Sequence, residues 1–514
     1  MVRNSCALYF FFLLVLTGIT SVPVQAQESS MVQDSIYSET LQEMRKIEVI
    51  YPKGYNPAAA DKYEVLYCLE GIPGFAKVEY NFLTGEGFIP NLVLVGLPNS
   101  VRNGVNMRDR DFTPTHTYGE TGGADRFLTF LKKELLPYMQ AHYAVKSKGH
   151  TLYGGSLGGL FAVYTFLKEP ALFTSYIAID PSLWWDNFYL IKEARQFIAN
   201  PAELHNTLWL AGREGSAYQY MGIAQMDSVL SSKQLAGFTW KRQLYANETH
   251  YSTQFKGLWD GLKFSYGGFY AATGGYPASR QLMIKPQGGI VVKGKPFKLI
   301  CYNLADSPYV HFTTDGTEPA VTSRSLAGEQ TELTLDKTTL VKLKSISMRE
   351  EYNREDSVLF ETGRVLQPMA LPGDIKPGGL HYVYYEGNWD TMPDLSHLRP
   401  MREGKASNEF DLSNFPVQSG YILSMDGYIK IERPGYYIFT LGGKNFKAFL
   451  DGQLILGNRI TGIEQSYMVP LAKGVYPLRI QYLHIKGDNN PTPLYLKPED
   501  VTDFAIPPAM LYSH

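Results

Sequence analysis

A serine stands between closely spaced glycines in the segment Thr151–Leu160. The segment reads Thr-Leu-Tyr-Gly-Gly-Ser-Leu-Gly-Gly-Leu, so Gly154 and Gly158 lie two residues on either side of Ser156. The segment begins with an apolar run typical of a strand and is followed by a run compatible with a helix. Small residues at these positions allow a tight strand-to-helix turn, which exposes the serine hydroxyl and points the amide of Leu157 at the same spot. The pattern predicts a serine nucleophile with one donor for an oxyanion.

A serine nucleophile of this kind needs a base, and the base needs an acid that orients it; along the chain they follow in the order serine, acid, histidine. His250 comes directly after the last predicted strand of the region, residues 239–244, and is the candidate base. Glu214, at the carboxyl end of the preceding strand, is the preferred acid. Asp180, after the strand before that, is the alternative, and Asp227 lies within a predicted helix.

The loop after the apolar strand at residues 63–69 is expected to supply a second oxyanion donor. Gly71 lets the backbone approach a substrate closely, and the amide of Ile72 is the candidate donor beside that of Leu157. Together these groups predict ester hydrolysis through an acyl-enzyme. Such a mechanism needs neither a metal ion nor an organic cofactor.

Four further side chains are candidates for contact with the substrate. Trp184 and Trp185 would offer flat apolar walls to an aryl acyl group, and we expect one of them in the core and the other facing the substrate. Arg108 and Arg110 would meet an anionic or catechol-bearing substrate. Structural ion pairs with the neighbouring aspartates are the alternative for both arginines.

The elements that must position these residues alternate between strand and helix from about residue 32 to residue 270. This alternation predicts an α/β domain with a mostly parallel, doubly wound sheet. Beyond a glycine-rich linker the helical patterns end, and short strands recur in residues 280–365 and, after a second Pro/Gly-rich joint, in residues 378–500. Two all-β sandwich domains are therefore expected after the α/β domain.

The N-terminal residues have the pattern of an export signal. Arg3 precedes an apolar run, Ala7–Leu16, and small residues near Ala26 predict cleavage after it, so residues 1–26 are read as a signal peptide. The run is shorter than the roughly 20 residues of a membrane-spanning helix. The sequence predicts export to the periplasm or the extracellular space, without a membrane span.

The composition bears on the partners, the fold and the state of the cysteines. The 514 residues carry 48 Lys+Arg against 50 Asp+Glu, a balance that argues against nucleic acid as a partner. The aromatic fraction of 13%, with 36 Tyr, favours β-sheet domains. After removal of the signal, Cys68 and Cys301 remain, in different predicted domains, and are expected to be free buried thiols.

Several motifs of the α/β region follow one another in a characteristic order. They are Tyr67–Gly71, Arg110–Pro114, Gly154–Phe161, Pro181–Trp185 and the late Glu248-x-His250. With these motifs, residues 47–266 resemble the α/β-hydrolase group that includes esterase D and the enterochelin esterases. The resemblance implies an α/β-hydrolase fold with Ser156 as nucleophile and His250 as base. This chain departs from the group at Asp180, where a small polar residue is usual, and some members work with serine and histidine and no clear acid.

The later domains have resemblances of their own. Val310–Pro319 and Thr339–Ser345 resemble the immunoglobulin-like domain at the end of chitobiase-type hexosaminidases, which usually serves as a spacer. Residues 379–496 resemble the protective-antigen-type lectin-like β-sandwich, whose members often bind glycans. Some members hold calcium, but the comparable loop here, Gly442–Asn445, offers too few oxygen ligands, so no metal site is predicted. A glycan partner is implied, with a structural role as the alternative.

These observations predict an exported serine carboxylic-ester hydrolase. The attached β-sandwich domains favour feruloyl or acetyl esters of a polysaccharide as substrates. The hydrolase resemblance favours a small-molecule alternative, a siderophore trilactone of the enterochelin type. A third interpretation is a glycan-binding protein with a degenerate hydrolase domain, against which the intact Ser156, His250 and glycine-flanked turn argue.

Overall fold

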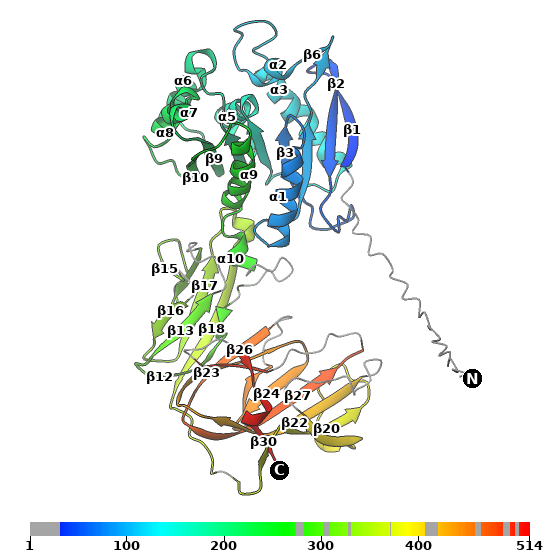
Figure 1. The fold of residues 1–514 in the computed structure, drawn as a ribbon, viewed down its shortest axis with the longest axis vertical. Coiled ribbons are helices and arrows are strands. Elements are labelled where there is room, and N and C mark those ends of the chain that lie inside the picture. The colour runs from blue at the N-terminus through cyan, green and yellow to red at the C-terminus, as the bar shows by residue number, and fades with distance from the viewer. Residues whose placement is uncertain are drawn as a thin grey trace, which may run out of the picture.

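The protein is described by a computed structural model, shown in Figure 1. The described residues are 31–273, 282, 284–301, 309–326, 330–370, 372–406, 420–457, 464–486, 494–498 and 503–514. The predicted signal peptide, residues 1–26, lies outside them. No helix within the described ranges is long and apolar enough to cross a membrane.

The N-terminal domain is built on one eight-stranded sheet. In spatial order its strands are β1 (Met31–Ser38), β2 (Glu43–Ile50), β4 (Leu92–Leu97), β3 (Glu64–Leu69), β7 (Thr151–Gly155), β8 (Ser175–Ile179), β9 (Asn206–Arg213) and β10 (Phe238–Tyr245). The strands from β4 to β10 run parallel, whereas β1 and β2 pair antiparallel at one edge. The central strands β3, β4 and β8 are buried along their whole length, because helices cover both faces of the sheet. The predicted α/β-hydrolase fold is confirmed.

Two layers of helices enclose the sheet (Figure 1). One face packs against α1 (Gly74–Gly85) and α9 (Ser252–Ser265). The other face packs against α3 (Ala124–Phe130), α4 (Leu136–His142), α5 (Leu157–Lys168), α6 (Trp185–Ala199) and α8 (Ile223–Leu230). Since the parallel strands all end at one edge, the loops that follow β3, β7, β8, β9 and β10 meet there. The candidate catalytic residues come from these loops.

The all-β part consists of two sandwiches, as predicted, but the sandwiches share a sheet. Strands β15 (Arg324–Ser325), β14 (Val310–Thr313), β17 (Thr339–Ser345), β18 (Arg354–Gly363) and β12 (Gly289–Val292) continue through β26 (Glu464–Leu471) into β23 (Gly435–Gly442), β28 (Tyr495–Pro498) and β29 (Phe504–Ala505). The junction is a parallel pairing of Gly289 with Met468. Met468 and Ile438 are also buried in the core of the first sandwich, so the two sandwiches are packed together rather than merely tethered.

The remaining strands close each sandwich. The first sandwich is completed by a sheet of β11 (Ile284–Lys285), β13 (Pro296–Cys301) and β16 (Gln330–Thr334). The second is completed by β19 (Lys376–Pro377), β30 (Leu511–Ser513), β22 (Tyr421–Ile431), β27 (Gly474–His484), β24 (Phe446–Leu450) and β25 (Gln453–Leu456), with β20 (Leu380–Glu386) and β21 (Arg402–Ala406) beside β22. Cys68 and Cys301 are free and buried, which confirms the prediction made for them.

A buried arginine joins the first sandwich to the hydrolase domain. Arg349, between β17 and β18, donates from Nη1 to Glu64 Oε2 at 2.5 Å and from Nη2 to the hydroxyls of Thr151 and Ser175, each at 2.9 Å. Tyr352 donates to the other oxygen of Glu64 at 2.6 Å. Burial raises the pKa of Glu64, but the charges of Arg349 and Lys146 outweigh it and hold that pKa below its usual value. The sandwich expected to be a spacer is therefore in direct, charged contact with the α/β domain, at the start of β3, β7 and β8.

A second buried carboxyl group, that of Glu79 on α1, has no such partner. Its side chain is 1% exposed, and neither of its oxygens has a hydrogen-bond partner among the described residues. Burial, together with the charge of Asp260, raises the pKa of Glu79 to about 9. The carboxyl group is thus protonated in the folded protein at neutral pH.

Replacing Glu79 with Gln is expected to stabilise the protein at alkaline pH. Because the pKa is higher in the folded than in the unfolded chain, folding takes up a proton, and the free energy of unfolding falls as the pH rises from about 5 to about 9. Gln cannot ionise, so Glu79→Gln should gain about 1–3 kcal/mol at pH 8 and little at pH 4.5. Urea unfolding at both pH values measures this difference, and an equal effect of the substitution at the two would contradict it.

Candidate active site

Ser156 occupies a strained turn between β7 and α5. Its backbone has φ 55° and ψ −117°, a conformation that non-glycine residues rarely adopt. A Cβ on Gly154 would lie 2.3 Å from the carbonyl carbon of Gly158, so a side chain there would force the turn apart. Of the two glycines predicted to permit the turn, Gly154 is required by this close approach of strand and helix, whereas a Cβ on Gly158 would meet its nearest neighbour, Leu69, at 3.4 Å, an ordinary contact.

The two predicted oxyanion donors are placed differently. Leu157 is the first residue of α5, so its amide has no partner inside the helix and is part of the positive end of the helix dipole. The amide of Ile72 instead donates to Glu48 Oε2, at 2.9 Å. Glu48 reaches this loop from β2, and Gly96 beside it leaves room for the carboxylate, because a Cβ there would lie 2.6 Å from Glu48 Oε2. In this conformation Ile72 is engaged by a carboxylate and does not offer its N–H to a substrate.

His250 pairs with Asp180. Its Nδ1 lies 2.6 Å from Asp180 Oδ2, and the same oxygen accepts a hydrogen bond from Arg213 Nε at 2.6 Å. Asp180 follows β8, has a positive φ of 43° and is fully buried, whereas the His250 side chain is 46% exposed. With Nδ1 donating to the carboxylate, Nε2 of His250 is left as a proton acceptor.

Glu214, the preferred acid in the sequence, is not at this position. Its side chain is exposed, and no hydrogen bond joins it to His250 in the described part of the chain. Arg213, the last residue of β9, points to Asp180, and Glu214 follows it outside the strand. The structure therefore places the alternative carboxylate, Asp180, against the histidine.

Ser156 and His250 line one cavity of about 500 Å³. The described contacts contain no direct hydrogen bond between them; the Ser156 hydroxyl lies 3.4 Å from the hydroxyl of Ser182. Catalytic hydrogen bonds are often long in a free enzyme and shorten when substrate binds. The cavity is lined by Leu69, Glu70, Gly71, Ile72, Pro73, Phe75, Arg108, Tyr153, Gly155, Ser156, His250, Tyr251 and Gln254.

Of the four candidate substrate contacts, Arg108 alone is among the residues that line this cavity. Arg108 lines the cavity and pairs with Glu70. Arg110 pairs with Glu43 and Asp111 and does not line the cavity. Burial raises the pKa of Glu43, but hydrogen bonds from Arg110 and Arg45 lower it to about 2, as expected for a structural ion-pair network.

One of the two tryptophans lies in the core, as expected, but the other does not line the cavity that it was expected to face. Trp185 is buried and donates from Nε1 to the Thr115 hydroxyl at 3.0 Å, whereas Trp184 is 44% exposed. Neither is among the residues that line the cavity around Ser156. The sequence analysis gave no role at the site to Arg213 or Ser182. Arg213 directly precedes Glu214 in the chain, and Ser182 lies within the motif Pro181–Trp185.

Two separate regions of the chain are similar to known protein families. Residues 38–253 match the family model described as putative esterase, and residues 379–509 match the PA14 domain. The chain is 29% identical over 176 residues to the ferri-bacillibactin esterase BesA of Bacillus subtilis, covering 30% of this chain and 61% of that protein. It is 35% identical over 120 residues to the siderophore enterobactin esterase of Emericella nidulans, covering 22% of this chain and 40% of that protein.

One solved structure also aligns with part of the chain. The siderophore hydrolase EstA from Aspergillus nidulans aligns with a TM-score of 0.40 and 22% identity, over 50% of this chain and 98% of that one. The chain spans less than two thirds of the length of the two curated relatives above.

Proposed function

We propose that the N-terminal domain is a serine carboxylic-ester hydrolase that works through an acyl-enzyme. The observation that carries this proposal is the buried Asp180 carboxylate on Nδ1 of His250, in a cavity that His250 shares with the strained Ser156. This arrangement supplies a nucleophile, a base and a group that orients the base.

The reaction follows from these positions. Nε2 of His250 accepts the hydroxyl proton as Ser156 Oγ attacks the ester carbonyl, and the amide of Leu157 donates to the oxygen that becomes negative. The protonated His250 then gives its proton to the departing alcohol, which leaves an acyl-serine. Water, deprotonated by His250, attacks the acyl carbonyl and releases the acid and the free serine.

Arg213 acts in this scheme through Asp180. Its guanidinium shares Asp180 Oδ2 with His250, so the carboxylate is held from two sides in the orientation that fixes the histidine tautomer. Arg213 also donates to Tyr220 at 2.8 Å, which restrains the guanidinium in turn. We assign Arg213 as a positioning residue.

For the substrate we favour a lactone of the siderophore type, with feruloyl or acetyl esters of polysaccharide as the second candidate. The names of the curated relatives, esterases of bacillibactin and enterobactin, support the first. Arg108 in the cavity, beside the aromatic Phe75 and Tyr251, suits an anionic, aryl-bearing substrate. The match to the PA14 domain supports the second candidate, because a glycan-binding domain would bring the esterase to a polysaccharide.

A fluorophosphonate probe tests the proposed reaction. The full chain should be labelled on Ser156 and should hydrolyse an activated aryl ester, while Ser156→Ala should lose both properties. An unlabelled, inactive wild-type protein would refute the proposal. Comparing rates on methyl ferulate, acetylated xylan and a catecholate trilactone separates the two substrate candidates, since the favoured class should be hydrolysed faster by orders of magnitude.

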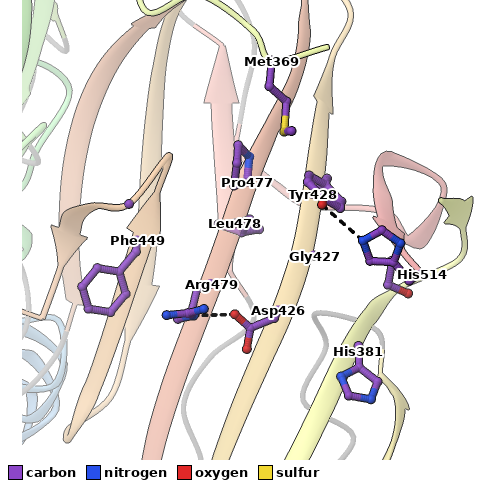
Figure 2. Close-up of a pocket in the computed structure, with 12 residues that line it drawn as sticks. Met369, His381, Asp426, Gly427, Tyr428, Phe449, Pro477, Leu478, Arg479 and His514 are labelled. Atoms are coloured by element: carbon purple, nitrogen blue, oxygen red, sulfur yellow. Dashed lines mark hydrogen bonds and ion pairs between the residues drawn. The ribbon is translucent and has the colours of Figure 1, made fainter. Parts of the chain in front are cut away.

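We further propose that the C-terminal sandwich binds a glycan. The candidate site is a cavity of about 800 Å³ on the sheet that contains β22, β27 and β24 (Figure 2). Asp426 on β22 pairs with Arg479 on β27, and Tyr428 lies 3.3 Å from His514 Nε2. Phe449 from β24 lines the same cavity. Charged hydrogen-bonding groups beside aromatic rings are suited to sugar hydroxyls and ring faces, and glycan-array binding that disappears in Asp426→Ala would support the role.

The N-terminal pattern leads to one more proposal, that residues 1–26 direct export and are removed. N-terminal sequencing of the secreted protein should begin at Gln27, and retention of the intact leader would contradict it.

A further inference from the structure

Helices α1 and α9 carry a row of solvent-exposed apolar side chains on their outer surface. The two helices lie side by side on one face of the sheet, and both start at its catalytic edge (Figure 1). The exposed fractions are 63% for Val78, 59% for Phe82, 74% for Tyr251 and 47% for Phe255. Phe75 and Trp259 complete the row, and we call these six residues the aromatic strip.

The strip is continuous with the catalytic cavity. Phe75 and Tyr251 belong both to the strip and to the cavity lining around Ser156. The ring centre of Phe75 lies 6.2 Å from that of Tyr251 and 6.0 Å from that of Phe255, both edge to face. Farther along the two helices, the ring centres of Phe82 and Trp259 form a second pair at 5.8 Å. The strip therefore leads directly out of the site where the ester would be cleaved.

Helical geometry gives the strip its direction and length. Tyr251, Phe255 and Trp259 recur every four residues, so they stack along one side of α9. At 1.5 Å of rise per residue, the eight steps from Tyr251 to Trp259 extend about 12 Å from the cavity. Phe82 is seven residues from Phe75 on the neighbouring helix, which places it at about 10 Å.

Packing of the domain accounts for Phe75 and Trp259, which are partly buried against the core, but not for the four exposed side chains of the strip. The helices already bury their other sides against the sheet, through Ala76, Tyr80 and Leu83 on α1 and through Leu258 and Leu262 on α9. Contiguous exposed apolar surface of this kind typically marks a place where something binds.

We propose that the aromatic strip is a substrate subsite, which holds additional aryl groups of an ester whose scissile carbonyl lies at Ser156. This inference rests on the proposed esterase function. An aryl group fits better than a sugar, because Val78, Phe82 and Phe255 have no group that could hydrogen-bond to hydroxyls. The substrate class is thus an ester with two or more aryl groups, the outer ones about 10–12 Å beyond the part of the cavity wall formed by Phe75 and Tyr251.

The experiment compares a large and a small ester on the full chain. The large ester is a cyclic trilactone with three catechol amide arms, and the small one is p-nitrophenyl acetate. In Phe82→Ala and Phe255→Ala, kcat/KM for the trilactone should fall about 5- to 20-fold each, mainly through KM, because each variant removes an aromatic contact made with the bound substrate. Hydrolysis of the small ester should stay within about twofold, because neither residue lines the catalytic cavity.

Tyr37→Ala is the matched control. Tyr37 is a 49% exposed aromatic residue on β1, outside the strip, and its loss should leave both rates unchanged. Trilactone rates in Phe82→Ala and Phe255→Ala equal to wild type would overturn the strip, as would a wild-type enzyme that cleaves the small ester but not the trilactone. Failure of the wild type on both esters, with Ser156 unlabelled by fluorophosphonate, would overturn the esterase function itself.

Discussion

Asp180→Asn is expected to lower kcat for an activated aryl ester about 1,000- to 10,000-fold. The carboxylate accepts the Nδ1 proton of His250 at 2.6 Å, and this leaves Nε2 free to take the proton of Ser156. An Asn amide can donate to Nδ1 instead, which would move the imidazole proton to Nε2 and remove the base. The Asn side chain also lacks the negative charge that stabilises the imidazolium formed during attack. Steady-state kinetics on p-nitrophenyl acetate measures the loss.

Glu214→Gln is the matched control for this experiment. Both positions follow neighbouring parallel strands, but the Glu214 side chain is exposed and outside the cavity lining. Its kcat should stay within about twofold of wild type. If Glu214→Gln lost activity as severely as Asp180→Asn, or if Asp180→Asn stayed within tenfold of wild type, the acid would not be Asp180. Thermal unfolding of both variants verifies that they are folded.

The contrast between these two carboxylates shows where prediction from sequence ended. The order of strands and the loops that follow them could be predicted, because continuous apolar runs identify buried parallel strands. Which residue after a strand points to the histidine depends on the phase of the strand and on the turn after it. Asp180 reaches His250 with a positive φ of 43°, a local conformation that no pattern in the sequence indicates.

The prediction that Ile72 is an oxyanion donor failed for a similar reason. The glycine beside it was expected to let the backbone approach a substrate closely, and Gly71 does have a positive φ of 92°. The group that it approaches is Glu48, which stands on β2, one strand in from the edge of the sheet, and is 24 residues away in the chain. Contacts between distant segments of this kind depend on the sheet order, which periodicity does not reveal.

The exposed aromatic strip illustrates a different limit. Apolar residues at a spacing of four predict a helix with a buried face, and α9 has such a face in Leu258 and Leu262. Phe255 and Trp259 repeat with the same period on another side of the helix. Only the structure distinguishes the side that packs on the sheet from the side left in solvent.

The contact of the first sandwich with the hydrolase domain depends on one arginine in a short connection between strands. Arg349→Met is expected to lower the free energy of unfolding of the hydrolase domain by about 3–5 kcal/mol. The substitution leaves the Glu64 carboxylate buried without its guanidinium partner, and it also removes the donors to Thr151 and Ser175 at the start of β7 and β8. Urea unfolding of the full chain, followed by tryptophan fluorescence, measures the change.

Two further variants separate this junction from a general effect of losing charge. Lys344→Met removes a partly exposed ion pair with Glu355 in the same sandwich and should cost less than about 1 kcal/mol. Adding Glu64→Gln to Arg349→Met removes the uncompensated charge and should recover part of the lost stability, a coupling that additive effects would not produce. If Arg349→Met shifted only the transition of the sandwiches, the hydrolase domain would be stable without this contact. A shift of the hydrolase transition would instead mean that the first sandwich contributes to the stability of the α/β domain. It does so by holding the amino ends of β7 and β8, the strands whose carboxyl ends lead to Ser156 and Asp180.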